Sequence, residues 1–210
     1  MFKTITSEKM IEILKAMAAR IDKEKDFLTE LDNEIADGDH GINMAKGFNA
    51  VVPKIEAMAG KDIGSLLKTT GMTLVSTVGG SAGPLYGTAF MKAGAALKDK
   101  MEIDANDLIA AVDAAIGGIQ MRGKAVEGEK TMLDAICPAH KAFKAAIEAG
   151  EDVKAALGKA VEAAQAGVEY TKTIKATKGR ASYIGDRSIG HQDPGATSAT
   201  YMYEEFLANI

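Results

Sequence analysis

The chain has 210 residues, and its 25 Lys and Arg against 29 Asp and Glu give a formal net charge of −4. This balance, without a long run of either sign, excludes the basic footprint of a nucleic-acid-binding protein and an acidic disordered tail. A lone cysteine, Cys137, cannot form an internal disulfide, and no apolar run approaches the ~18 residues of a membrane span, so we expect a cytoplasmic protein without membrane partners. The length suits one domain over residues 1–210.

Apolar residues recur at helical spacing along most of the chain, and the period-two alternation of strands is scarce. The first stripe runs over residues 10–21, and a polar break at 22–24 separates it from a short segment ending at Leu31. Further stripes lie at 48–55, 63–74, 108–119, 133–147 and 153–168, while Pro84 and Pro194 stand where two more helices should begin. The pattern predicts an all-α protein.

The connections between these helices are of two kinds that alternate along the chain. Residues 59–61, 99–104 and 150–151 form short plain turns, whereas 36–41, 78–83, 122–130 and 174–193 are rich in glycine, charge and hydroxyl groups. Alternate loops of an antiparallel up-and-down bundle lie at the same end. We therefore expect the four unusual loops to meet at one rim and to form a ligand site there.

The first unusual loop, "EIADGDHG" at residues 34–41, gathers acidic side chains with Asp32 just before it. In one continuous helix Asp32 and Asp39 would lie roughly 10 Å apart. Gly38 and Gly41 predict instead that the helix ends here, so that the chain can bring Asp32, Asp37 and Asp39 together. Three clustered carboxylates repel one another unless a cation neutralises them or one takes up a proton.

Among cations, Mg²⁺ suits this cluster best. An EF-hand is excluded because, whichever aspartate is counted as position 1, position 12 is not glutamate and position 6 is not glycine. Zinc is disfavoured because no Cys/His cluster has ligand spacing. Mg²⁺ takes few protein oxygens and completes its shell with water and phosphate. The alternative is a solvated helix end at which Asp39 caps the next helix.

Two further loops suggest an anion. "VGGSAGPLYGT" at 78–88 places Ser81 and Ala82 among glycines before a helix, whose free N–H groups would bind phosphate; a tight helix crossing is the alternative. "GIQMRGKA" at 118–125 nearly matches a P-loop, but Ala125 replaces the required hydroxyl and the preceding stretch is helical. We therefore predict no P-loop here, only a turn of a glycine and a basic residue, Gly123 and Lys124, that can border a nucleotide.

The last unusual loop, within residues 178–198, is expected to be ordered but without regular structure. Arg180 and Arg187 can bind phosphate oxygens as a fork, Asp193 can cap the last helix, and Pro194 can take its first position. The alternative is a covering lid with surface arginines. Because no constellation offers a covalent nucleophile, the loops together indicate a polyphosphate site suited to phosphoryl transfer.

Three histidines and the cysteine remain. Cys137 and His140 lie on an apolar helical stripe, which favours core packing. His40 follows the acids directly and either contacts a phosphate or bonds an aspartate. His191 has no partner visible in the sequence.

Four segments, "DNEIADGDHG", "GMTLVSTVGGSAGPLYGT", "RGKAVEGEKTMLD" and "KGRASYIGDRSIGHQDPGATS", resemble in order the L subunit of dihydroxyacetone kinase, especially its free-standing bacterial form that depends on the phosphotransferase system. This resemblance implies an antiparallel barrel of eight helices with a nucleotide held at one rim. It also implies that bound ADP accepts a phosphoryl group from a phosphohistidine on an M subunit, and that the resulting ATP passes it to dihydroxyacetone on a K subunit.

Matching the motifs residue by residue implies that Asp32, Asp37 and Asp39 hold two Mg²⁺ ions, and that Arg180 is the catalytic residue. The implied ADP contacts are His40, Gly41, Ile42, Asn43, Ser81, Ala82, Gly123, Met132, Arg180, Asp193, Pro194 and Gly195. Met132 suits an adenine contact because its polarizable thioether can lie against a ring. Two alternatives stay open: the L part of an ATP-dependent kinase for another small molecule or a fatty acid, and a nucleotide-sensing module read by a regulatory protein.

Overall fold

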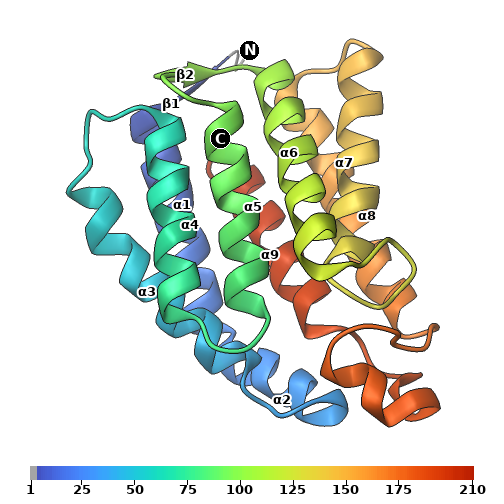
Figure 1. The fold of residues 1–210 in the computed structure, drawn as a ribbon. Helices are drawn as coiled ribbons and strands as arrows, with labels where there is room; N and C mark the ends of the chain where they lie inside the picture. The colour runs from blue at the N-terminus through green and yellow to red at the C-terminus, as the bar shows by residue number, and fades with distance from the viewer. Residues whose placement is uncertain (1–3) are drawn as a thin grey trace.

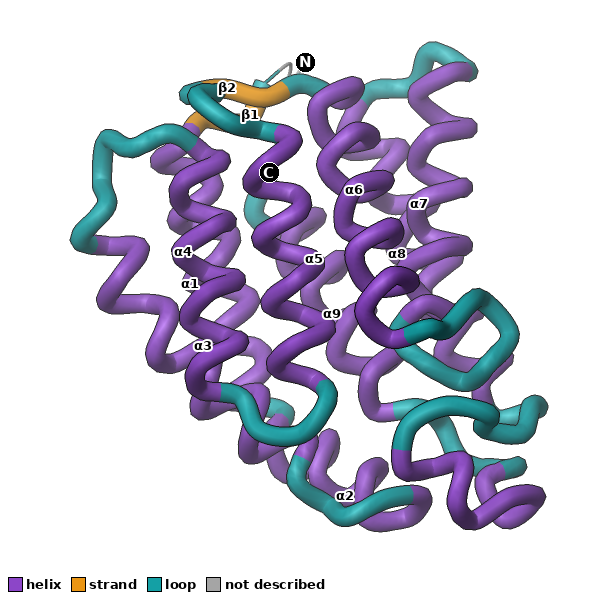
Figure 2. The backbone as a smooth tube through the Cα atoms, in the orientation of Figure 1, coloured by secondary structure: helices purple, strands orange, loops and turns teal. Residues whose placement is uncertain are grey.

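The structure is a computed structural model that describes residues 4–210, and it is almost entirely helical (Figure 1, Figure 2). Its elements in chain order are β1 (Ile5–Thr6), α1 (Ser7–Lys23), α2 (Lys25–Ile35), α3 (His40–Glu56), α4 (Ile63–Thr77), α5 (Ala82–Ala96), β2 (Glu102–Ile103), α6 (Ala105–Gly123), α7 (Leu133–Glu148), α8 (Val153–Thr171), the 3₁₀ helix η1 (Arg180–Ser188) and α9 (Pro194–Ala208). The all-α prediction is confirmed.

Eight of these helices form a closed up-and-down ring. From α3 to α9 each helix packs against the next, α1 packs against α3, and α9 returns to α1. The remaining α-helix of the described residues, α2, is the short segment after the polar break, and it lies across one end of the ring (Figure 1). Because the ring helices alternate in direction, the loops that were expected to share a rim do share one.

Each helix buries one apolar face, and several begin at a capping aspartate. Asp62, Asp104 and Asp152 each accept a backbone N–H three residues further on, which satisfies a donor that the first turn leaves free. The apolar faces line an interior cavity of about 190 Å³ between the helices. The lining of this cavity is apolar, unlike the polar rim described below.

Glycines let α4 and α5 approach closely. A Cβ at Gly71 would lie 2.5 Å from the carbonyl oxygen of Gly87, and one at Gly94 would lie 2.6 Å from that of Gly64. For the 78–88 stretch, a tight helix crossing was the alternative to an anion site. Gly83 and Gly87 do serve such a crossing, because α4 or its C-cap would also block a Cβ at either position. Gly79 and Gly80 have a different role, at the rim.

A strap of two antiparallel strands, orange in Figure 2, lies at the end of the ring opposite the rim. Ile5 pairs with Ile103 and Thr6 with Glu102, and Ser7 N–H donates to the carbonyl of Met101 at 2.9 Å. The sequence predicted only a plain turn at 99–104, because a two-residue ladder is too short to show alternation. In the part of the chain that the structure describes, none of the helices combines the length and apolar character needed to cross a membrane.

Two local expectations differ from the structure. Helix α5 starts at Ala82, two residues before Pro84, so the proline stands inside the first turn rather than opening the helix. The segment expected to lack regular structure contains η1, which is interrupted at Gly185, where φ is +61°. Short 3₁₀ turns carry little apolar periodicity, which explains why the pattern did not reveal them.

Candidate functional site

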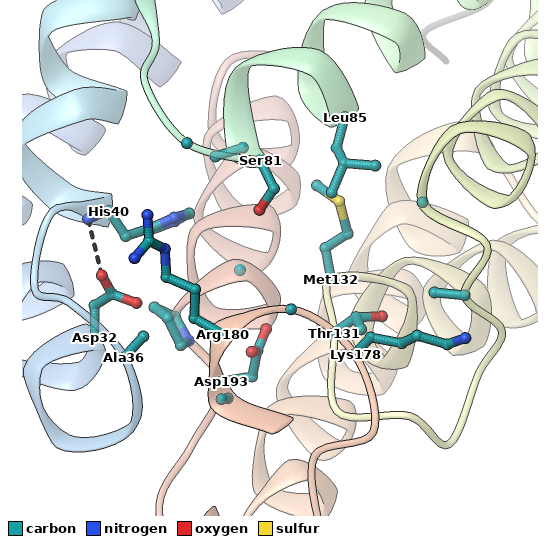
Figure 3. A pocket seen from close by; sticks show the side chains of 18 of the residues that line it. Asp32, Ala36, His40, Ser81, Leu85, Thr131, Met132, Lys178, Arg180 and Asp193 are labelled. Atoms are coloured by element: carbon teal, nitrogen blue, oxygen red, sulfur yellow. Dashed lines mark hydrogen bonds between the residues drawn. The ribbon is translucent and has the colours of Figure 1, made fainter. Parts of the chain in front are cut away.

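The four unusual loops surround a cavity of about 470 Å³ at the rim (Figure 3). Its volume falls in the range of about 300–1,000 Å³ that is typical of small-molecule sites. The acidic turn supplies one wall, the loop before α5 a second, the loop between α6 and α7 a third, and the segment before α9 the fourth. The expectation that the four unusual loops meet at one rim is therefore confirmed.

The three aspartates converge at one corner of this cavity. One carboxylate oxygen from each of Asp32, Asp37 and Asp39 lies within 4.8 Å of the other two. Gly38 makes the reversal possible, because its φ is +70° and a Cβ there would lie 1.8 Å from Oδ1 of Asn33. Three oxygens at this spacing, open to a cavity, form the donor set that Mg²⁺ prefers.

Asp32 also holds the start of α3. Its Oδ2 accepts the backbone N–H of Asp39 at 2.9 Å and that of His40 at 3.1 Å, the bond drawn in Figure 3. Its other oxygen, Oδ1, makes no hydrogen bond within residues 4–210 and is available to a cation. Asp39 occupies the N-cap position but its side chain makes no capping bond, so the alternative reading of Asp39 as the cap is wrong.

Helices α3, α5, α7 and α9 all begin at this rim and direct the positive ends of their dipoles towards it. A carboxylate already accepts helix N–H groups at two of these ends: Asp32 at α3, and Asp193, which accepts Ala196 N–H at 2.7 Å, at α9. At α7 the carboxylate of Asp134 lies in the first turn and accepts Thr131 N–H at 2.7 Å from the loop just before the helix. Helix α5 has no side-chain cap and no acidic residue in its first turn, which leaves its N–H groups open to an external anion.

Arg180 brings a cation to the acidic corner. Its Nη1 lies 3.1 Å from Oδ2 of Asp37, and Figure 3 shows its side chain extending into the cavity towards His40. Arg187 was expected to join it but does not line the cavity. It follows Gly185, where the backbone turns, and its Nε bonds instead to the nearby carbonyl of Ile184.

A buried polar network lies behind the acidic corner. Nε2 of His40 is 2.9 Å from Oγ of Ser198, and the hydroxyl of Tyr86 is 2.7 Å from the same Oγ and donates to the carbonyl of Gly195 at 3.0 Å. Burial lowers the pKa of His40 to about 4, against the opposing effect of the Asp39 charge. The His40 ring is therefore neutral near pH 7, and it bonds a serine rather than an aspartate.

Asp193 is a second strongly perturbed group. Burial raises the pKa of this carboxyl to about 7, and the charges of Asp134 and Asp32 act in the same direction. The N–H of Ala196 and the charge of Lys130 oppose the shift. A carboxyl with a pKa close to 7, at the wall of a cavity, is typical of functional sites.

The side of the cavity away from the aspartates is apolar. Leu85, Ile119, Ala125 and Met132 line it, and Figure 3 shows Leu85 and Met132 lying close to each other there. A planar, polarizable group such as a nucleobase suits this wall, since the Met132 thioether can pack against a ring. The cavity thus has a charged end and an apolar end.

All the site residues implied by the family resemblance line the cavity except Gly41, Ile42 and Asn43. Gly41 packs α3 on α2, because a Cβ there would lie 1.9 Å from the carbonyl oxygen of Lys25. Ile42 is 57% exposed, and Asn43 lies beside Gly79. The structure places these three residues in the first turn of α3, adjoining the cavity but not in its wall.

Several lining residues were not singled out from the sequence. They are Ile35, Ala36, Gly79, Gly80, Pro84, Leu85, Tyr86, Ile119, Arg122, Ala125, Lys130, Thr131, Lys178, Gly179 and Ala181. Leu85 and Tyr86 follow Ser81 and Ala82 by one helical turn, so helical spacing would have revealed them. Lys130 gave no signal, since a lysine in a charged stretch is normally solvated.

Comparison with known proteins was consistent with this architecture. The DAK2 domain model matches residues 34–208. The chain is 46% identical over 181 residues to the ADP-binding subunit DhaL of the PEP-dependent dihydroxyacetone kinase of Escherichia coli, covering 86% of each chain. It is 40% identical over 203 residues to the ADP-binding subunit DhaL of the PTS-dependent dihydroxyacetone kinase of Lactococcus lactis, covering 97% of each.

Longer proteins also match over one part of their length. Human triokinase/FMN cyclase is 33% identical over 202 residues, which are 96% of this chain and 35% of that protein. The crystal structure of the dihydroxyacetone kinase from C. freundii in complex with AMP-PNP and Mg²⁺ superposes with a TM-score of 0.76 over 96% of this chain and 34% of that one; at 24% identity this shows a shared fold. The chain belongs to the DAK2 domain family and to the family of ADP-binding subunits of dihydroxyacetone kinases.

Proposed function

We propose that this chain is the nucleotide-binding subunit of a dihydroxyacetone kinase that depends on the phosphotransferase system. The observation that carries the proposal is the convergence of Asp32, Asp37 and Asp39 beside Arg180, in a cavity whose opposite wall is apolar. In this role bound ADP accepts a phosphoryl group from a phosphohistidine on an M subunit, and the ATP so formed donates it to dihydroxyacetone on a K subunit. The relatives from E. coli and L. lactis, named as ADP-binding subunits of such kinases, support it.

The residues of the charged end are suited to a diphosphate with Mg²⁺. Asp37, Asp39 and the unbonded Oδ1 of Asp32 would hold the metal, and we propose two ions because three carboxylates together with phosphate oxygens offer enough ligands for both. The open N-terminus of α5, at Ser81 and Ala82, would bind phosphate oxygens through backbone N–H groups. The adenine would lie against Leu85 and Met132.

In phosphoryl transfer such a chain contributes positioning and charge. Arg180 presents a planar fork of donors at the edge of the acidic corner, where negative charge accumulates as the phosphoryl group moves. His40 has its Nε2 committed to Ser198, which fits a supporting role rather than that of a phosphate carrier. The substrate site is then expected on the K subunit, and we further propose that residues 1–210 act as one domain in the cytoplasm.

The proposal is tested on the purified chain. We expect one ADP and two Mg²⁺ per chain, found by mass spectrometry of the released nucleotide and by metal analysis. With K and M subunits and the phosphotransferase donors, the mixture should phosphorylate dihydroxyacetone, while the chain alone should not. Nucleotide lost on desalting together with turnover of ATP would indicate an ATP-dependent kinase, and capture of a regulatory protein without a K-like subunit would indicate a sensing module.

A matched pair of variants tests the site itself. Asp37→Asn removes one charge from the acidic corner and should abolish retention of ADP. Asp26→Asn removes the same charge from an exposed position on α2, the helix before the acidic turn, and should retain ADP fully. Equal ADP content in the two variants would show that the aspartates are not part of the nucleotide site.

A further inference from the structure

Lys130 is an unusual residue in the loop between α6 and α7. Its side chain is almost fully buried, with 1% of the residue exposed, although an ammonium group loses its hydration on burial. Its backbone is in the left-handed region at φ +61°, which for a residue other than glycine costs about 1–2 kcal/mol. Two unfavourable features persist at one position only where the surroundings stabilise both.

The ammonium is satisfied by carbonyl groups from distant parts of the chain. It donates to the carbonyl of Thr171 at 2.5 Å and to that of His191, and more weakly to that of Ile174 at 3.5 Å. A lysine has three donors, and all three are used. Thr171 ends α8 and His191 lies just before α9, so the ammonium joins the two ends of the segment 172–193.

The segment is also anchored elsewhere: Thr177 N–H donates to the carbonyl of Glu129 at 3.3 Å, and ion pairs join Arg180 to Asp37 and His191 to Glu34. Its buried apolar residues Ala176 and Ala181 pack with Ile35 in a small cluster separate from the main core. Two bonds close the segment on itself: Gly190 N–H to the carbonyl of Lys172 at 2.7 Å, and Ala176 N–H to Oγ of Ser188 at 2.9 Å. The segment is thus a loop closed at its base, and Lys130 lies at that base.

The same base lies next to both ends of the cavity. Thr131 and Met132, which follow Lys130, line the cavity on its apolar side. The segment carries Arg180 to the charged side, and its last residue is Asp193, whose N–H donates to Oγ1 of Thr171 at 3.0 Å. A displaced base would move Arg180 away from the charged side of the ligand.

We propose that Lys130 is a positioning residue of the nucleotide site, whose ammonium holds the base of the 172–193 segment closed and thereby places Arg180 at the acidic corner. Lys130 acts through the backbone of the segment and not through contact with the phosphates, because its donors are occupied by carbonyls. Only the test of this proposal by nucleotide dissociation rests on the proposed function.

The first test is a double-mutant cycle on the full chain with Mg²⁺ and a fluorescent ADP analogue. Lys130→Met keeps the apolar stem and removes the donors, and we expect it to speed dissociation of the analogue about tenfold, as for the loss of bonds to a charged group. Arg180→Gln should also speed dissociation, and the double variant should be no faster than Arg180→Gln alone. Independent, multiplicative effects of the two substitutions, or no effect of Lys130→Met, would overturn the proposal.

The control is Lys172→Met, which removes an ammonium from the same segment. Lys172 is paired with Glu169 at the surface and does not line the cavity, so dissociation should not change. If Lys130→Met fails to fold, as circular dichroism would show, Lys130→Gln supplies two N–H donors and should give an intermediate rate. A Lys130→Gln rate equal to that of the parent chain would likewise contradict the proposal.

A second readout needs no ligand. Tyr183 projects from η1 with 86% of its surface exposed, which makes it a target for chymotrypsin once the segment opens. Cleavage there should be at least about fivefold faster in Lys130→Met than in Lys172→Met, because local opening exposes the backbone. Equal cleavage rates would overturn the proposal, whereas a chain that binds no nucleotide at all would contradict the proposed function and leave this readout to decide the role of Lys130.

Discussion

Arg180 and Asp37 form an ion pair at the mouth of the rim cavity, with Nη1 of the arginine 3.1 Å from Oδ2 of the aspartate. The arginine side chain is 64% exposed, so the pair contributes no more than about 0–1 kcal/mol to stability. Its importance is geometric, because it holds a guanidinium beside carboxylates that would otherwise repel the phosphates of a ligand. Arg180 can exchange this carboxylate for a phosphate at little energetic cost.

Arg180→Lys should slow phosphoryl transfer while ADP stays bound. The substitution keeps one charge and removes the planar fork, so we expect a loss of about 10- to 1,000-fold in the rate of transfer to a K subunit. Single-turnover measurement with quenched samples checks this. Arg187→Lys, outside the cavity, is the matched control, and an equal loss in both variants would exclude a special role for Arg180.

Asp32 and Asp37 should respond differently to truncation. Asp32→Ala removes the acceptor for two backbone N–H groups at the start of α3, so the free energy of unfolding should fall by about 1–3 kcal/mol. Asp37→Ala removes a charge from a repulsive cluster and should leave stability within about 0.5 kcal/mol of the parent chain. Denaturant unfolding without metal or nucleotide measures both, and equal losses would contradict the capping role of Asp32.

The stability of the ligand-free chain should show two opposing pH effects. His40 has its pKa lowered from 6.5 to about 4 by burial, so between these values the unfolded chain binds a proton that the folded chain lacks, and stability rises with pH. Asp193 has its pKa raised from 3.8 to about 7 by burial, so the folded chain binds the extra proton and stability falls as pH rises. The two effects nearly cancel between about pH 4 and 6.5.

Single variants should separate these effects. Relative to the parent chain, the free energy of unfolding of Asp193→Asn should rise by up to about 1.4 kcal/mol per pH unit between about pH 4.5 and 6. For His40→Gln it should fall by a similar amount over the same range. Urea unfolding at several pH values provides the measurement, and parallel pH profiles for the parent and either variant would show that the corresponding pKa is not shifted.

Two glycine substitutions should have opposite signs. Gly41→Ala places a Cβ 1.9 Å from the Lys25 carbonyl oxygen, a backbone atom that cannot yield, so the variant should lose at least about 2 kcal/mol and disturb the acidic turn. Gly117→Ala, in α6 with open space around the new Cβ, should gain roughly 0.5–1 kcal/mol from helix propensity. Thermal melts compare them, and a stable Gly41→Ala would show that α2 and α3 are not locked together.

Much of the arrangement could be predicted from the sequence because it follows from periodicity and loop composition. Alternation of direction in a ring of helices brings every second loop to one end, so the four unusual loops had to meet. Gly38 predicted the chain reversal that brings the aspartates together, since glycine readily adopts the positive φ found there. The acidic residues and Arg180 were therefore predicted at the site from the loops, whereas Met132 was implied by the family resemblance.

Other features depend on contacts that no local pattern contains. The burial of Lys130 is set by carbonyls 41 and 61 residues away, and the strap of β1 and β2 by a pairing of residues 5 and 103. Arg187 was expected in the cavity, yet the turn at Gly185 directs its neighbours elsewhere. Tertiary context decides such cases, because composition alone does not distinguish a buried lysine or a cavity arginine from a solvated one.

The strap between β1 and β2 has a practical consequence for experiments. Ile5 lies in that strap, at the end of the ring opposite the cavity, and the carbonyl of Ile210 accepts a bond from Lys154 at the start of α8, at the same end. An affinity tag, a fluorophore or a sensor surface attached at either end of these 210 residues would leave the rim facing solution. Immobilised chains would thus all expose the rim cavity to a partner protein in solution. A surface-binding measurement of partner association requires this orientation.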